Sequence, residues 1–173
     1  MATVNLRRGS LIGEFRGDNV EGIINGILTD LVIDASELLD DIGQKVVLVS
    51  IRKNFEEEGR PEKWADLRPR TQRERVAEGY GANSPKLERT GELKKSVTEK
   101  SNAMYELDKH SLKITNFLIK GIRNNAGDET MGLVARPFFF LQKGDERDAE
   151  RVGIKFIQKK VAEIVKANKR GLG

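Results

Sequence analysis

Few side chains in this sequence are of the types that carry out chemistry. The 173 residues include no cysteine and a single histidine, His110. Thiolate metal sites, cysteine nucleophiles, Ser-His-Asp triads and histidine acid/base pairs all need residues that the sequence does not contain. We therefore expect no metal site and no bound cofactor, and we expect His110 to lie on a solvated turn.

Two pairs of acidic residues remain as candidates for acid/base catalysis. They are Asp40 with Asp41 and Glu146 with Glu150, and both pairs fall in segments predicted to be helical. Carboxylates on a helix surface beside lysines are solvated far more often than they are catalytic. We therefore expect that the protein is not an enzyme and has no catalytic residue.

Four arginines crowd one short segment, namely Arg68, Arg70, Arg73 and Arg75. Two glutamates lie at helical spacing to pair with them, so a solvated helix face is the plainer interpretation and a contact surface the sharper one. The net charge of the chain is +4 and its pI is near 9.3. This surplus is modest for a dedicated DNA-binding domain. Binding of nucleic acid through residues 68–75 stays open as the alternative function.

The N-terminal segment has a glycine at every fourth position, Gly9, Gly13 and Gly17. A phosphate-binding loop is excluded because no Gly-Lys-Ser/Thr follows and no apolar strand precedes. We expect residues 1–17 to form a flexible or strand-like arm. No run of 18 apolar residues and no secretory signal is present, so we expect no membrane contact.

Hydrophobic residues make up 38% of the sequence and charged residues 34%, which is ordinary for a soluble domain with a core. Apolar residues recur at helical spacing from Asp18, and a second capping pattern at Asp34–Glu37 predicts a break before a further helix to about Glu58. Gly59-Arg60-Pro61 should end that helix.

The polar segment that follows should fold back on the helix before it. Trp64 and Leu67 are expected to form a lid on that helix. Thr71 to Glu74 is a capping box that predicts a short helix to about Glu78, and Thr90 is a plausible N-cap for a helical turn over residues 92–96.

Beyond Ser96 the apolar period falls to two, which is typical of strands. Strands are predicted at Met104 to Leu107, Leu112 to Thr115, Phe117 to Ile122 and Met131 to Ala135, with a turn at Asp108 to His110 and a loop from Asn124. A last helix from Asp145 to about Lys169 should cover one face of the sheet, because it has acids in its first turn and keeps an apolar stripe. The sequence thus predicts one α+β domain over residues 18–173: a long N-terminal helix or helix pair, a small mainly antiparallel sheet, and a C-terminal helix packed on it.

Ala135-Arg-Pro-Phe-Phe-Phe140 gathers three of the seven phenylalanines. Each could bury about 150–250 Å2. On a strand, consecutive side chains face opposite ways, so at least one of Phe138, Phe139 and Phe140 should face a second layer or a neighbouring subunit. Arg136 is held extended by Pro137 and could clamp a carboxylate.

Taken together, these blocks resemble the phage virion morphogenesis family, the tail-completion and head–tail joining proteins of tailed bacteriophages of the Mu and P2 types. The matching features are a helix ending in Phe55, Trp64-Ala-Asp-Leu67 with Pro69 and Thr71, Leu87-x-x-Thr90-Gly91-x-Leu93-x-x-Ser96, and Ala135-Arg136-Pro137-Phe138 before a final helix. Their order and spacing agree over roughly residues 38 to 165. The family's Tyr-Ala-x-x-His-Gln-like block is replaced by Leu118-Ile-Lys-Gly-Ile-Arg.

The resemblance implies a structural virion protein that forms a ring of identical subunits, with six as the expected number, at the head-proximal end of the tail. Such a ring would complete or terminate the tail or join it to the head. Its partners would be neck, connector and tail-tube or sheath proteins, with non-specific contact to DNA in the lumen, after assembly in the host cytoplasm. The residues expected as interface or structural anchors are Trp64, Leu67, Arg68, Arg70, Arg73, Thr90, Gly91, Leu93, Arg136, Pro137, Phe138, Phe139 and Phe140.

Overall fold

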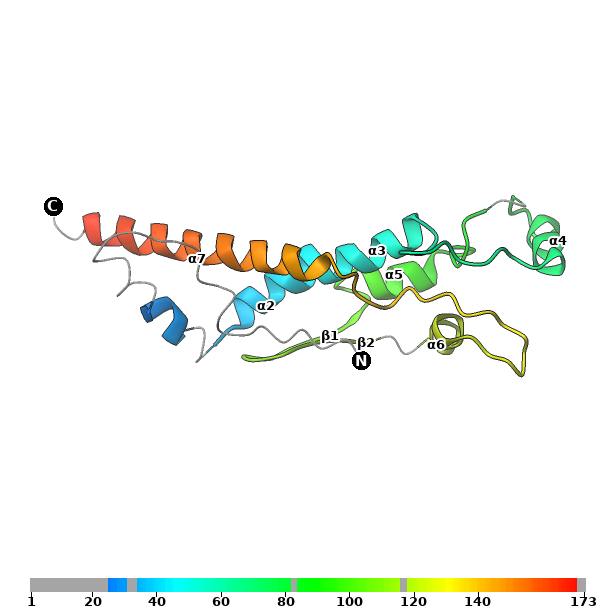
Figure 1. Ribbon diagram of the computed structural model, residues 1–173, viewed down its shortest axis with the longest axis horizontal. Coiled ribbons are helices and arrows are strands. Elements are labelled where there is room, and N and C mark those ends of the chain that lie inside the picture. The colour runs from blue at the N-terminus through cyan, green and yellow to red at the C-terminus, as the bar shows by residue number, and fades with distance from the viewer. Residues whose placement is uncertain (1–24, 31–33, 82–83, 116–117, 171–173) are drawn as a thin grey trace. The chain divides into compact units, whose positions relative to one another are not determined.

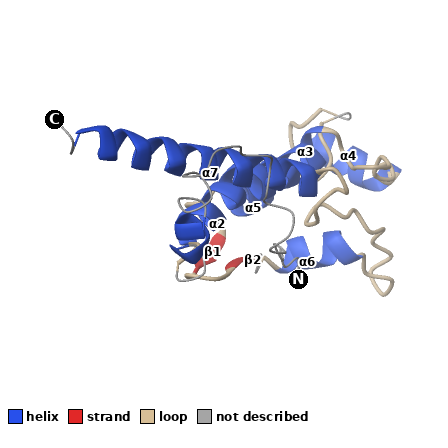
Figure 2. Ribbon diagram, turned by 60° about the vertical axis from the view of Figure 1, so that its left-hand side comes forward, coloured by secondary structure: helices blue, strands red, loops and turns tan. Residues whose placement is uncertain are grey.

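The computed structural model describes residues 25–30, 34–81, 84–115 and 118–170 (Figure 1). The fold is α+β, as predicted, with helices far outweighing a two-stranded sheet (Figure 2). The chain divides into two compact units. In the described residues the first unit holds 47–105 and 114–142, and the second holds those up to 46, 106–113 and those from 143 onwards. The predicted arm, residues 1–17, and the predicted helix start at Asp18 lie outside the described residues.

One continuous helical segment begins at the expected restart. Asp34 accepts the backbone N–H of Ser36 at 2.9 Å, and α2 (Ser36–Ile42) follows. The helix then passes through a π-helical turn, η1 (Gly43–Val47), into α3 (Leu48–Glu56). The apolar stripe is buried as predicted, but no pattern in the residues indicates the π-helical turn.

The first unit is built around α3. Its buried face packs against α5 (Glu92–Thr98), whose own buried residues include Leu93 and Val97 (Figure 1). Gly59 ends the helical segment with φ 111°, and it allows the chain to turn back: a Cβ there would lie 2.5 Å from the carbonyl oxygen of Glu62. Trp64 then lies buried against α3, which confirms this half of the predicted lid, whereas Leu67 is half-buried and lines a cavity instead.

Two further helices of the first unit differ from the sequence-based expectation. The arginine-rich helix α4 (Pro69–Ala77) begins two residues before Thr71, because Pro69 is already suited to the first helical position. A strand was expected from Phe117 to Ile122, but the structure has the helix α6 (Ile119–Ala126) there. The β-branched residues suggested a strand, whereas the three-residue spacing of Ile119 and Ile122 fits a helix. Phe117 itself lies outside the described residues.

The sheet is smaller than predicted. β1 (Met104–Leu107) and β2 (Leu112–Thr115) form the expected hairpin, closed where Asp108 donates its backbone N–H to Ser111 at 2.8 Å, and His110 is exposed on the turn. The strand expected at Met131 to Ala135 is not formed: Leu133 makes one isolated bridge to Asp128, and the rest is turn and extended loop. A tight turn with Gly132 at φ 58° prevents continuous pairing there.

The second unit is organised by α7 (Asp145–Arg170), close to the predicted bounds. We expected this helix to cover a face of the sheet; the packing partner in the structure is α2. The contact buries Leu38 and Ile42 of α2, while α7 buries Ala149, Phe156 and Ile157 at helical spacing. Lys160 adds an ion pair to Glu37 at 2.6 Å.

None of the described helices combines the length and the apolar character that crossing a lipid bilayer requires.

Candidate functional site

Separate blocks of the sequence meet in the first unit. Phe55, at the end of α3, packs edge-on against Trp64 with ring centroids 5.8 Å apart, and its ring lies 4.9 Å from that of Phe138. Phe55 and Phe138 are almost completely buried. Because Leu93 is also buried on α5, which packs against α3, the family-like blocks share one core.

A buried asparagine on α3 holds the Arg-Pro-Phe segment. Asn54 has no exposed surface, and its amide donates to the carbonyl oxygens of Phe138 at 2.8 Å and Phe140 at 3.1 Å. Its own oxygen accepts the Nε–H of Arg60 at 2.9 Å, and Arg60 also donates to Ser50. Every polar group of the Asn54 side chain is thereby paired, as a buried amide requires.

The same segment is tied on its other sides. Trp64 Nε1 donates to the carbonyl oxygen of Pro137 at 2.9 Å. The side chain of Asn125, at the end of α6, accepts the backbone N–H groups of Phe138 and Phe139, each at 2.9 Å. The segment is therefore fixed by hydrogen bonds rather than by strand pairing.

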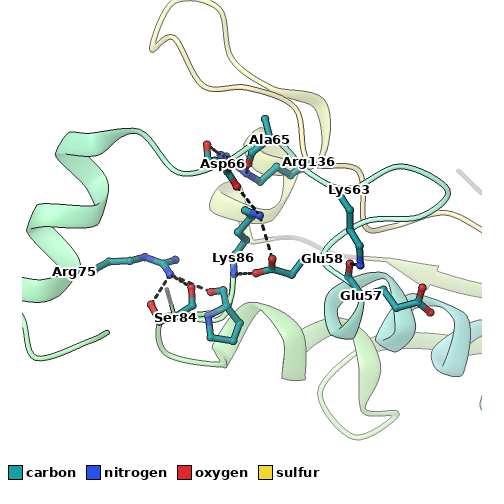
Figure 3. Close-up of polar contacts among 10 residues, drawn as sticks. Glu57, Glu58, Lys63, Ala65, Asp66, Arg75, Ser84, Lys86 and Arg136 are labelled. Carbon is teal, nitrogen blue, oxygen red and sulfur yellow. Dashed lines mark hydrogen bonds and ion pairs between the residues drawn. The ribbon is translucent and has the colours of Figure 1, made fainter. Parts of the chain in front are cut away.

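These contacts correct two expectations. The three phenylalanines do not sit on a strand, so the alternation rule does not apply: Phe138 is buried, while Phe139 and Phe140 are half-buried in a bend. Arg136 clamps no carboxylate. Its guanidinium donates to the backbone carbonyl oxygens of Ala65 and Asp66, each 3.1 Å from Nη2 (Figure 3).

A lysine ties the segment after Trp64 to the end of α3. Figure 3 shows Lys86 between two acids, and its Nζ lies 3.1 Å from both Glu58 and Asp66. Glu58 also accepts the backbone N–H of Lys86 at 2.7 Å. Burial would raise the pKa of Glu58, but the bonds and the charge of Lys86 outweigh it and the pKa lies below its ordinary value. Burial likewise opposes charge on Lys86, yet its two acids raise its pKa.

A cavity of about 540 Å3 opens beside this framework, entirely within the first unit. Its walls come from the segment around Arg68, from α4, α5 and α6, and from the loop around Gly132. Five of the predicted contact residues line it, namely Leu67, Arg68, Thr90, Leu93 and Arg136. The structure thus brings together residues from three of the sequence blocks in one concave site.

Three arginines that line this cavity form no ion pair with a described acid: Arg68, Arg75 and Arg136, which we call the arginine pocket. The charges of Glu58 and Glu78 act on Arg75, and that of Asp66 acts on Arg136. Arg75 and Arg136 are each only 5% exposed. Burial lowers the pKa of Arg136, and the charges of Arg75 and Arg68 lower it further. Arginine nevertheless stays protonated in proteins, so the pocket keeps its positive charge.

Arg75 carries the least expected feature of the site. Its Nη1 donates to the carbonyl oxygen and hydroxyl of Ser84 and to the carbonyl oxygen of Pro85 (Figure 3). Its Nε–H is buried and has no acceptor among the described residues. Burial lowers its pKa, and nearby Arg89 adds to that effect. Such a group is uncommon and calls for an explanation.

Two cations at the rim of the cavity are paired with acids. Arg89 pairs with Glu78 at 2.7 Å, and Lys120 pairs with Glu92. The side chain of Arg68 makes no hydrogen bond or ion pair with any described residue, and its guanidinium rests on Gly132: a Cβ at Gly132 would lie 2.9 Å from Nη2. The pocket therefore has a free guanidinium at its edge and two fixed ones inside.

The remaining predicted residues lie elsewhere. Trp64, Pro137 and Phe140 line a second cavity of about 390 Å3, also in the first unit. Arg70 pairs with Glu74 on exposed α4, and Arg73 is exposed there; neither lines either of these two cavities. Gly91, not Thr90, is the N-cap of α5, at φ 71°.

Sequence reasoning missed Asn54, Lys86, Asn125 and the burial of Arg75. Asn54 and Asn125 bond backbone groups of residues 138–140, Lys86 bonds the carboxylates of Glu58 and Asp66, and Arg75 bonds Ser84 and Pro85. All these partners lie outside the residue's own helix or turn, so no local pattern marks the contacts. No group of histidines and acids among the described residues could hold a metal ion. Comparisons with family models, with curated proteins and with solved structures give no match.

Proposed function

We propose that this chain is a structural protein of a tailed-phage virion, which forms a ring at the head-proximal end of the tail and completes, terminates or joins it. The observation that supports this most is the meeting of the family-like blocks in one core. Phe55, Trp64 and Phe138 contact one another although they are far apart in the sequence.

The surface of the first unit also suits repeated protein contacts. Apolar side chains are exposed on α6 and on the loop after it: Ile119 is 67% exposed, Ile122 55% and Met131 64%. Met131 also lines the cavity that holds the arginine pocket. Exposed apolar groups beside unpaired arginines are typical of interface residues.

The nucleic-acid alternative draws less support from the geometry. It relied on Arg68, Arg70, Arg73 and Arg75 acting together. Arg75 is buried, and Arg70 is engaged with Glu74. This leaves two unpaired exposed arginines of the four, whereas phosphate binding gains affinity from many exposed cations.

Immunogold electron microscopy of intact virions, with antibodies raised against the full chain, tests the proposal. Gold particles should lie at the junction of head and tail. Label along the tail, on the capsid surface or absent from virions would contradict a role in the neck.

A further inference from the structure

We infer that the arginine pocket binds carboxylate side chains of a second copy of this chain, namely Glu146 and Glu150 in the first turns of α7. This inference rests on the proposed ring and assigns the contact that would build it.

The side chains of the arginine pocket have the chemistry to bind an anion. The guanidinium of Arg68 makes no hydrogen bond or ion pair with the described residues, Arg75 keeps a buried Nε–H without an acceptor, and Arg136 is only 5% exposed. Guanidinium groups bind carboxylates and phosphates through paired hydrogen bonds. An incoming anion would supply the direct ion pair that none of the three arginines makes with a described acid.

The shape of the pocket favours a protein side chain over a nucleic-acid backbone. Leu67, Leu93 and Leu133 line the cavity beside the arginines. Its volume of about 540 Å3 admits side chains from a helix turn. A phosphate backbone instead meets cations on open surfaces and gains nothing from an apolar wall.

The acids of α7 are the complementary group on the same chain. The first turn carries Asp145, Glu146 and Asp148, and Glu150 follows beyond it. Asp148 pairs with Arg151, but the carboxylates of Glu146 and Glu150 make no hydrogen bond or ion pair with another described residue. Their spacing places both on one face of the helix, where they are exposed.

A pocket on one copy and acids on the next make a heterologous, head-to-tail contact. Repetition of such a contact closes into a ring when its rotation fits. The proposal therefore gives each subunit one donor surface and one acceptor surface.

Arg68→Ala is the first variant, because the Arg68 side chain has no hydrogen bond to a described residue to lose and the fold should survive. Sedimentation velocity at low salt should show self-association weakened about 10- to 100-fold, the loss expected for hydrogen bonds to a charged group. Arg73→Ala removes the same charge from the exposed face of α4, the helix that follows Arg68, and should change the association constant less than about twofold. Equal effects of the two variants would overturn the proposal, since general charge would then explain both.

A mixing experiment tests whether the contact joins two copies. Arg68→Ala keeps the acids, whereas the double variant Glu146→Gln, Glu150→Gln keeps the pocket. At a concentration where the wild type assembles but a 10- to 100-fold weaker contact does not, each variant alone should stay monomeric. Together they retain one intact contact per pair, so native mass spectrometry of isotope-labelled mixtures should show heterodimers but no ring. Two unmixed monomers would contradict a contact between copies.

Titration calorimetry with inorganic phosphate, and duplex DNA binding, separate the other occupants. If the wild type binds phosphate and the Arg68→Ala variant assembles normally, the pocket is a small-anion site. If Arg68→Ala and Arg73→Ala weaken DNA binding equally, the arginines bind nucleic acid instead. If both the wild type and the Arg68→Ala variant form rings, the proposed contact is refuted, but the proposed role in the virion is not. A wild-type chain that stays monomeric refutes the contact as well, and the virion role is then judged by the location of the protein in particles.

Discussion

Trp64 donates its indole N–H to the carbonyl oxygen of Pro137, 2.9 Å away and 73 residues later in the chain. This bond joins the segment after α3 to the Arg-Pro-Phe segment. Trp64→Phe keeps most of the packing but leaves that carbonyl without its donor. We expect a loss of about 1–2 kcal/mol in the free energy of unfolding. Urea unfolding followed by circular dichroism measures it, and a change below about 0.3 kcal/mol would show that the bond contributes little.

Asn54→Leu should be among the most damaging polar substitutions in the chain. It removes two donors to the carbonyl oxygens of Phe138 and Phe140 and the acceptor for Arg60. Leaving such buried groups unpaired costs about 1–3 kcal/mol each, so a total of about 3 kcal/mol or more is expected.

The matched control is Asn102→Leu, which changes the same residue type at an exposed position. It should alter the free energy of unfolding by less than about 0.5 kcal/mol. Trp64 is the only tryptophan and lies buried in the first unit, so its fluorescence reports the unfolding of that unit. Similar losses for the two variants would argue against the Asn54 network.

Gly59→Ala should destabilise the first unit by about 2 kcal/mol or more. The backbone there has φ 111°, which side chains other than glycine's rarely adopt, and the new Cβ would meet the carbonyl oxygen of Glu62 at 2.5 Å. Gly81→Ala is the control, because no atom lies within 4 Å of its Cβ position. If thermal unfolding shows the same midpoint for both variants, the turn after α3 does not need glycine.

The stability of the first unit should fall in acid through Glu58. Its pKa is lower in the folded chain than the ordinary 4.5, because Lys86 outweighs the effect of burial. The stabilisation is therefore present above pH about 4.5 and is lost as the pH falls through the folded pKa. Lys86, whose pKa is raised, contributes at neutral pH and loses its effect only as the pH rises above the ordinary 10.5.

Glu58→Gln tests this by removing the titrating group. Unfolding free energies measured from pH 7 to 3 should fall less steeply than in the wild type. Adding Lys86→Met to Glu58→Gln should flatten the profile little further, since the second acid partner of Lys86, Asp66, is exposed. An unchanged acid slope in Glu58→Gln would assign the acid sensitivity to other carboxylates.

Local patterns in the sequence were sufficient for several elements. Helical spacing located the stripe through Leu38, Ile51 and Phe55, glycine and proline marked its end, and the alternation around the turn at His110 predicted the hairpin. Trp64 was expected on α3 because a large apolar ring after a helix stop has few other places to be buried. These inferences depend on neighbours within a few turns.

The predictions that were wrong or missing concern residues whose structure depends on contacts outside their own segment. Residues 119–126 contain Ile119 and Ile122, whose β-branched side chains favour strands, yet they form α6 with both side chains exposed. Arg75 lies in a strongly polar stretch, so its burial depends on the carbonyl oxygens of Ser84 and Pro85 across a loop. The arginine pocket was partly foreseen, since Arg68 and Arg136 were expected as contact residues, but their proximity depends on the tertiary fold.

The most direct test of the proposed role is electron microscopy of a lysate from a phage in which this gene is deleted. We predict a block in particle assembly at the neck. Filled heads beside separate tails of normal length would indicate joining, and overlong or irregular tails would indicate termination. Normal infectious particles would contradict the account.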